Sequence, residues 1–272
     1  ALPMLAASIL VGGRFTYNNV PDLKDIDSIK QLLAIMGAAV ETKGGTVTID
    51  TSGLFNFEAP YELVRKMRAS VLVLGPLVAR LKRARVSLPG GCAIGARPIN
   101  MHLQGLSRLG ADINLAHGYV EASADRLTGN ELFFDIPTVT GTENLMMAAV
   151  LAKGTTVLRN AAREPEISAL ADMLNQMGAD VTGAGTPVIT INGVDRLEPT
   201  DVEIIPDRIE AGTYMVAAAL TGGRIRLTGV NADHLKAISA KIEAAGTQIA
   251  YENNDIIVTG NHPIRSVDIK TL

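Results

Sequence analysis

The sequence predicts an α/β protein built from a repeated unit, because the same pattern returns four times along the chain. Four amphipathic segments each end at a glycine, and these glycines, Gly37, Gly110, Gly178 and Gly246, are 73, 68 and 68 residues apart. Glycine commonly follows the last residue of a helix, where the backbone takes a positive φ. Similarity at a nearly fixed period indicates several copies of one structural unit.

Each unit is predicted to contain a helix, a strand, a second helix and two further strands. The second helix carries apolar residues at spacings of three and four, as Ile167, Leu170 and Leu174 do before Gly178. Two short runs of alternating apolar and polar residues follow each glycine and indicate strands. The first helix of each unit is rich in small apolar residues and is expected at 2–10, 69–79, 144–152 and 212–220.

A break in this pattern at residues 197–201, with the sequence LEPTD, marks the predicted domain boundary. We expect residues 1–200 to form a domain of three repeats that carries the only cysteine, and residues 201–272 to form part of a second domain with one repeat. The chain opens inside an apolar helix and stops directly after the fourth unit. We therefore expect a fragment of a longer protein that lacks both ends.

The composition favours a globular chain, with 47% hydrophobic and 19% charged residues. A net charge of -3 and a pI near 5.9 argue against nucleic-acid binding. No apolar run approaches the ~20 residues of a membrane span. A single cysteine cannot form an intramolecular disulfide, which fits the cytoplasm. No cysteine and histidine cluster has the spacing of metal ligands, so we expect neither a metal nor a cofactor.

Positive charge gathers around the only cysteine. Between Glu62 and Asp112 the chain has no carboxylate but nine lysines and arginines, and Cys92 lies in this interval within the segment LPGGCAIGARP. The repeat is about four residues longer here than elsewhere, as expected of a functional insertion. Glycines leave backbone N–H groups accessible, and nearby arginines favour the thiolate. This pattern favours chemistry on a phosphorylated small molecule over a cysteine buried in the core.

Several motifs of this chain resemble the UDP-N-acetylglucosamine 1-carboxyvinyltransferase family, a group of enolpyruvyl transferases. These motifs occupy residues 1–3, 66–70, 75–80, 88–98, 160–166 and 206–210, so the resemblance covers essentially the whole chain. The cysteine separates it from the shikimate-pathway enolpyruvyl transferases. The resemblance implies an inside-out α/β barrel of two domains, each with threefold internal repetition, of which the second domain is incomplete here.

The activity that the resemblance implies is transfer of the enolpyruvyl group from phosphoenolpyruvate to the 3′-hydroxyl of UDP-N-acetylglucosamine, with release of phosphate. This is the first committed step of bacterial peptidoglycan synthesis. Cys92 matches the family's loop cysteine, which gives a proton to the enol methylene carbon, forms a covalent adduct with phosphoenolpyruvate and is alkylated by fosfomycin. The implied partners are these two substrates, with no nucleic acid and no membrane.

The same resemblance assigns substrate contacts. Two arginines match family residues that reach the substrates, and a guanidinium suits phosphate or carboxylate because it donates two parallel hydrogen bonds. The segment 98–102 matches the uracil and ribose site, where an asparagine replaces the aspartate of many relatives, and the loop 139–142 matches a diphosphate site. The expected contacts are Arg68, Arg97, Pro98, Ile99, Asn100, Met101, His102, Val139, Thr140 and Gly141.

Several roles stay open at this point. His102 could contact the ligand or act only as a structural hydrogen-bonding residue of a helix at 100–109. Glu164 and Asp207 are interpreted as helix caps or ion-pair partners rather than catalytic groups. Four further cations are interpreted mainly as a solvated face, with direct substrate contact left open: Arg80, Lys82, Arg83 and Arg85.

Departures from the family leave two other interpretations. A family lysine that binds phosphoenolpyruvate would precede Ala1, and the family's aspartate would follow Leu272, so the chain as it stands is expected to be inactive. Ile136 or Pro137 replaces another family lysine. One alternative is a non-catalytic ligand-binding paralogue. The other, which is weaker, is another enzyme of the same fold, either a shikimate-pathway transferase or an RNA 3′-phosphate cyclase. Retention of Cys92 and its arginines favours the enzyme.

Overall fold

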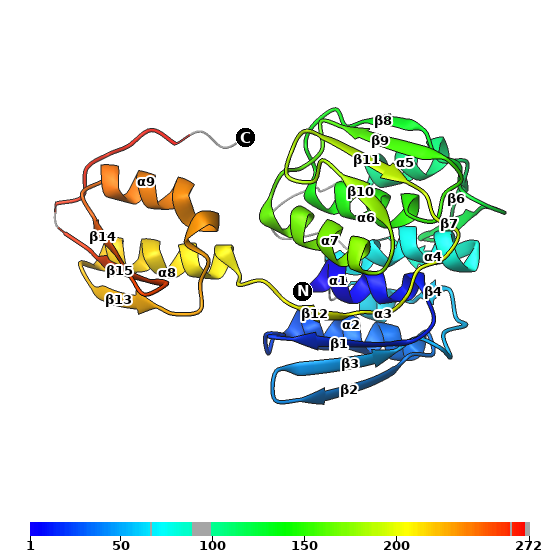
Figure 1. Ribbon diagram of the computed structural model, residues 1–272, viewed down its shortest axis with the longest axis horizontal. Helices are drawn as coiled ribbons and strands as arrows, with labels where there is room; N and C mark the ends of the chain where they lie inside the picture. The colour runs from blue at the N-terminus through cyan, green and yellow to red at the C-terminus, as the bar shows by residue number, and fades with distance from the viewer. Residues whose placement is uncertain (66, 89–98, 262, 270–272) are drawn as a thin grey trace. The chain divides into compact units, whose positions relative to one another are not determined.

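The computed structural model describes residues 1–65, 67–88, 99–261 and 263–269 and divides into two compact units, Ala1–Ile204 and Ile205–Leu272 (Figure 1). The first unit runs past residue 200 because β12 (Asp201–Glu203) pairs in parallel with β1 (Arg14–Asn18). Asn19 adds a hydrogen bond from its amide to the carbonyl of Ile204, 2.8 Å away.

Within the described residues, unit 1 contains three copies of the predicted helix, strand, helix, strand, strand order, and unit 2 contains one. The first copy comprises α1 (Leu2–Ala7) with η1 (Ser8–Leu10), β1, α2 (Lys24–Ile35), β2 (Ala39–Lys43) and β3 (Thr46–Asp50). The second comprises η2 (Arg68–Val73) with α4 (Leu74–Leu81), β5 (Arg83–Ser87), α5 (Asn100–Arg108), β6 (Asp112–Ala116) and β7 (Tyr119–Ser123). The third comprises α6 (Val139–Ala149), β9 (Thr155–Arg159), α7 (Pro165–Gln176), β10 (Asp180–Thr182) and β11 (Val188–Asn192). Unit 2 comprises α8 (Arg208–Thr221), β13 (Arg224–Leu227), η3 (Ala232–Leu235) with α9 (Lys236–Ala244), β14 (Gln248–Glu252) and β15 (Asp255–Thr259).

Short connecting strands join neighbouring repeats of unit 1. The three strands of each repeat pair antiparallel, and a strand from the connection adds in parallel at one edge. The strand orders in the described residues are β12-β1-β3-β2, β4-β5-β7-β6 and β8-β9-β11-β10, with β4 at Glu58–Ala59 and β8 at Glu131–Phe133. These connecting strands were not predicted, because two or three residues are too few to show an alternating pattern.

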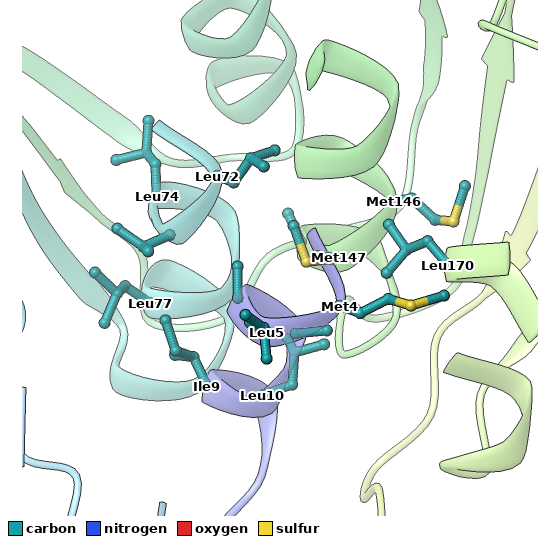
Figure 2. Close-up of a cluster of buried hydrophobic side chains, with 14 of the residues drawn as sticks. Met4, Leu5, Ile9, Leu10, Leu72, Leu74, Leu77, Met146, Met147 and Leu170 are labelled. Atoms are coloured by element: carbon teal, nitrogen blue, oxygen red, sulfur yellow. The ribbon is translucent and has the colours of Figure 1, made fainter. Parts of the chain in front are cut away.

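The first helices of the three repeats form the centre of unit 1. Figure 2 shows Leu5 of α1, Leu77 of α4 and Met147 of α6 among the side chains gathered there, and all three are fully buried. In Figure 1 these helices lie between the sheet that contains β1 and β3 and the sheet that contains β9 and β11. Unit 1 therefore has helices inside and sheets outside. This arrangement is the inverse of an ordinary α/β barrel, as predicted.

Glycines allow the central helices to approach one another closely. A Cβ atom on Gly75 of α4 would collide with the backbone and side-chain oxygens of Asn144 on α6. A Cβ atom on Gly105 of α5 would collide with the side chain of Leu145. Both α4 and α5 are therefore packed against α6 at distances that only glycine permits.

Two first helices begin earlier than the sequence predicted. Helix α6 starts at Val139 instead of residue 144, because the Thr138 hydroxyl caps it by accepting from the Gly141 amide at 3.3 Å. Helix α8 starts at Arg208 instead of residue 212, because the Asp207 carboxylate caps it. The prediction followed apolar residues only and so missed the polar first turn that each cap stabilises.

Candidate active site

The amino-terminal ends of several helices lie together at one end of unit 1. Glu143 of α6 is close enough to Glu166 in the first turn of α7 to interact with its charge, and Ala1, the residue before α1, also lies near Glu143. Helix η2, which begins at Arg68, packs against both α1 and α6. The first N–H groups of a helix have no partner within it and carry partial positive charge. This end of the unit therefore favours anions.

Glu143 lies beneath this end and is only 3% exposed. Burial and, to a smaller extent, the negative charge of Glu166 together raise the pKa of its carboxyl to about 8. Removal from water disfavours the charged form of a carboxyl group. Glu143 is therefore mostly a neutral acid at neutral pH and adds little negative charge to a region suited to anions.

The predicted site residues fall into two groups. Those that the structure describes come from two elements: Ile99 at the N-cap of α5 with the first residues of that helix, and the first turn of α6 from Val139 to Gly141. Cys92, Arg97 and Pro98 lie outside the described residues. The side chain of Arg68 is also not among those described. The roles assigned to these four residues stay predictions.

His102 joins the two described elements. It is 2% exposed, with Nδ1 2.9 Å from the amide nitrogen of Asn144 and Nε2 3.4 Å from the hydroxyl of Thr140. The other end of the Asn144 side chain accepts a hydrogen bond of 2.7 Å from the backbone N–H of Gly75. A chain of hydrogen bonds therefore runs from α4 through α6 and α5 to the first turn of α6.

A cavity of about 560 Å³ lies between α5, β6 and β8, and Leu145 of α6 also lines it. Met101, one of the predicted nucleotide contacts, lines it together with Gln104 and Arg108 of α5. Phe133 and Asp135 lie on the opposite wall. Apolar and aromatic walls with a few polar groups are typical of small-molecule sites.

Three of the four cations whose role was open bind groups of this chain. Arg80 donates to the backbone oxygens of Ile9 at 2.9 Å and Thr51 at 3.0 Å, and burial lowers the pKa of its guanidinium. It therefore ties the second repeat to the first. The Arg83 guanidinium lies over the ring of Phe57, with 4.0 Å to the centroid.

Arg85 is also held by its own sheet. Its guanidinium is 2.8 Å from the carboxylate of Glu58 on β4 and 3.3 Å from that of Glu121 on β7. It also lies over the ring of Tyr119, 3.8 Å from the centroid. The hydrogen bond to Glu58 is the main reason that its pKa is raised. Arg80, Arg83 and Arg85 therefore bind groups of the protein itself, which gives three of the nine cations between Glu62 and Asp112 a structural role.

The two carboxylates interpreted as caps differ. Asp207 accepts from the backbone N–H groups of Ile209 at 2.7 Å and Glu210 at 3.1 Å, so it caps α8 as expected. Glu164 occupies the N-cap position of α7 but makes no side-chain capping hydrogen bond. It accepts instead from the backbone N–H of Arg163 at 2.9 Å, so the prediction of a cap was wrong for this residue.

Sequence reasoning missed Glu143 and Asn144 as members of this region. The available signal was the run Thr142-Glu143-Asn144 inside a helix whose later residues are all apolar. Polar residues that are buried in a central helix usually have specific partners. The structure supplies some of these partners, since Thr142 accepts a hydrogen bond of 3.1 Å from the Ala162 amide.

Among the described residues, no group of three or more histidine, cysteine and acidic residues is placed to hold a metal ion. Likewise, none of the helices in the described ranges is long and apolar enough to cross a membrane.

The fold of this chain is one seen in solved enolpyruvyl transferases. The enolpyruvyl transferase NikO from Streptomyces tendae superposes with a TM-score of 0.84 at 24% identity, over 97% of this chain and 64% of that one. An EPSP synthase from Acinetobacter baumannii superposes with a TM-score of 0.73 at 21% identity, over 98% and 64% of the two chains. These likenesses confirm the predicted fold.

The sequence itself gives the family. The family model for EPSP synthase (3-phosphoshikimate 1-carboxyvinyltransferase) matches residues 1–272, and the chain belongs to this family. It is 64% identical over 272 residues to a protein of Desulforapulum autotrophicum and 63% identical to one of Desulfosudis oleivorans, both named UDP-N-acetylglucosamine 1-carboxyvinyltransferase. All of this chain aligns, but it spans 65% of the length of each relative. The predicted family resemblance is confirmed.

Proposed function

We propose that the full-length protein transfers the enolpyruvyl group of phosphoenolpyruvate to the 3′-hydroxyl of UDP-N-acetylglucosamine, in the cytoplasm, as a step of peptidoglycan synthesis. The observation that carries this proposal is 62 to 64% identity, over every residue of the chain, to three relatives named for this activity. Identity of this extent favours the enzyme over a degenerate paralogue, and the aligned range includes the cysteine segment at 88–98.

The charge distribution of unit 1 supports two anionic substrates. The first turn of α6 presents N–H groups at Val139 and Thr140, a position suited to a diphosphate. The neutral form of Glu143 below it avoids repulsion of the same anion. Arg68 and Arg97 are the guanidinium groups that the family resemblance assigns to substrate binding, and both keep their charge at every relevant pH.

The cavity beside Met101 supports a nucleotide. Its volume of about 560 Å³ accommodates a pyrimidine nucleoside, and Phe133 offers an aromatic wall to a base. The carboxylate of Asp135 and the amide of Gln104 can accept and donate hydrogen bonds at the edge of the base. Asn100, at the start of α5, adds both a donor and an acceptor at the first turn of that helix.

The proposed reaction assigns proton transfer to Cys92. The sugar 3′-hydroxyl gives its proton to a carboxylate base, for which the family's aspartate beyond Leu272 is the candidate, and its oxygen bonds to C2 of phosphoenolpyruvate. The Cys92 thiol gives its proton to the C3 methylene carbon in the same step, which leaves a thiolate and a tetrahedral intermediate. The C2–O bond to phosphate then breaks with departure of inorganic phosphate, C3 returns a proton to the thiolate, and the carbon–carbon double bond is restored. A positioned thiol near arginine side chains can serve in such proton transfer because its acidity is easily increased.

The test uses the full-length protein with phosphoenolpyruvate and UDP-N-acetylglucosamine, and measures released phosphate. We expect turnover in the wild type, loss of at least ~100-fold in Cys92→Ala, and covalent labelling by fosfomycin that this variant abolishes. Thr182→Val, at an exposed position on β10, is the matched control and should keep full activity. The competing activity is tested in parallel with 3-phosphoshikimate as acceptor. Turnover with that acceptor alone, or labelling that persists in Cys92→Ala, would overturn the proposal.

A further inference from the structure

The buried amide of Asn144 has only one possible orientation. The backbone N–H of Gly75 can only donate, so the atom that it meets at 2.7 Å must be the amide oxygen. The NH2 group of the fully buried Asn144 side chain therefore points the other way, toward His102. The backbone donor of Gly75 thus distinguishes the oxygen of this amide from its nitrogen. Such an assignment otherwise depends on the surrounding hydrogen-bond network.

The orientation of Asn144 fixes the proton on His102. The NH2 group lies 2.9 Å from Nδ1 and can only donate, so Nδ1 must accept with its lone pair. A neutral imidazole that accepts at Nδ1 carries its hydrogen on Nε2. Nε2 lies 3.4 Å from the hydroxyl oxygen of Thr140, so its hydrogen is within reach of that oxygen.

The direction of this last hydrogen bond determines what the Thr140 hydroxyl can do. A hydroxyl has one hydrogen to donate and two lone pairs to accept with. A Thr140 hydroxyl that accepts from His102 directs its own hydrogen elsewhere. Thr140 is half-buried in the first turn of α6, so one side faces the buried histidine and the other can meet a ligand.

We propose that Gly75, Asn144 and His102 form a relay that orients the Thr140 hydroxyl as a donor to a phosphate oxygen of the bound nucleotide. His102 and Asn144 are positioning residues that act through Thr140. This relay rests on the proposed function for the identity of the ligand. It assigns the open role of His102: this residue orients Thr140 and does not itself contact the nucleotide.

The first experiment determines which ring nitrogen of His102 carries the hydrogen, in the absence of any ligand. Full-length protein with 15N-labelled histidine is studied by NMR at neutral pH, and the His102 signals are identified by their loss in His102→Gln. We expect a neutral ring protonated at Nε2, and Asn144→Leu, which removes the amide donor, to change the nitrogen shifts of this ring. A ring protonated at Nδ1, or at both nitrogens, would refute the relay whether or not the protein binds a nucleotide.

The second experiment is a double-mutant cycle on binding of UDP-N-acetylglucosamine, followed by calorimetry. His102→Asn, too short to reach Thr140, should weaken binding about five- to tenfold, as should Thr140→Val, because each removes the oriented donor to an anion. The double variant should bind no more weakly than Thr140→Val alone. His102→Gln, whose amide can reach Thr140, should recover most of the affinity, and Thr140→Ser should keep it.

The outcomes separate the alternatives. If His102→Asn weakens binding further in the Thr140→Val background, His102 contacts the nucleotide itself and the relay is wrong. If the wild type does not bind UDP-N-acetylglucosamine, the proposed function and the phosphate part of this inference both fail, while the NMR result still decides the direction of the hydrogen bonds. Thermal midpoints of all variants identify any loss of binding that comes from unfolding, and Thr140→Ser against Thr140→Val tests the hydroxyl with little change to the fold.

Discussion

Glu143 shows at the scale of one residue how the fold sets a protonation state. An exposed glutamate has a pKa near 4.5, but burial and the charge of Glu166 raise the pKa of Glu143 to about 8. The folded chain therefore binds a proton that the unfolded chain has released, over the interval between these values. The stability that this proton gives is complete below about pH 4.5 and is lost as the pH rises toward 8.

Replacement of Glu143 by glutamine should remove this dependence. Glutamine is neutral at every pH, so the variant should gain stability relative to the wild type by about 1.4 kcal/mol for each pH unit between roughly pH 5 and 8. Urea denaturation of both chains at several pH values measures the difference. Glu203→Gln, an exposed position on β12, is the control and should follow the wild type. Parallel curves for wild type and Glu143→Gln would show that Glu143 is ionised in the folded chain.

Single residues also show what the sequence could and could not predict. The capping role of Asp207 follows from a carboxylate placed just before a helix, which is a local property. The partners of Asn144 come from Gly75, 69 positions away in the sequence, and from His102, 42 positions away. No local pattern reports such partners. Similarly, the sequence favoured a solvated position for Arg80, whereas in the structure its guanidinium donates to two backbone carbonyl groups.

At the scale of elements, the repeats were predictable and their connections were not. The glycines that end α2, α5, α7 and α9 and the alternating strands after them follow from local chemistry, and the structure confirms these elements. The parallel strands β4, β8 and β12 depend on pairing with a neighbouring repeat. The starts of α6 and α8 depend on polar caps that an apolar pattern does not show.

The close contacts of α6 give a prediction for elements. Alanine in a helix is more favourable than glycine by up to about 1 kcal/mol, but overpacking costs about 1–3 kcal/mol. Gly105→Ala meets the end of the Leu145 side chain, which can move, whereas Gly75→Ala meets a backbone oxygen and the anchored oxygen of Asn144. Both should be destabilising, and Gly75→Ala should cost more.

Denaturation midpoints test this order, with Gly212→Ala as the control. In α8 the nearest atom to an added Cβ would be the tip of Ile238 at 3.0 Å, which is flexible, so little change is expected there. Equal costs for Gly75→Ala and Gly105→Ala would mean that α4 and α6 can separate as easily as a side chain can repack.

At the scale of the whole molecule, the two units differ in how fully they cover their first helices. In unit 1, α6 is buried from Gly141 to Ala149. In unit 2, α8 exposes Ile209, Val216 and Leu220 to 61%, 45% and 65%. Exposed apolar groups on one helix favour association or binding of hydrophobic dyes.

We therefore expect this chain to bind the dye ANS and to self-associate at micromolar concentration through α8. Val216→Lys with Leu220→Lys should lower ANS fluorescence by roughly half and shift sedimentation toward the monomer, because charged side chains oppose burial of that face. Leu115→Lys, at a position of 59% exposure on β6, is the matched control and should leave both signals nearly unchanged. The double variant should also keep its denaturation midpoint, since neither side chain is buried in the core of unit 2. Strong dye binding that survives in the double variant but disappears in Leu115→Lys would show that the apolar surface that binds ANS lies on unit 1 and not on α8.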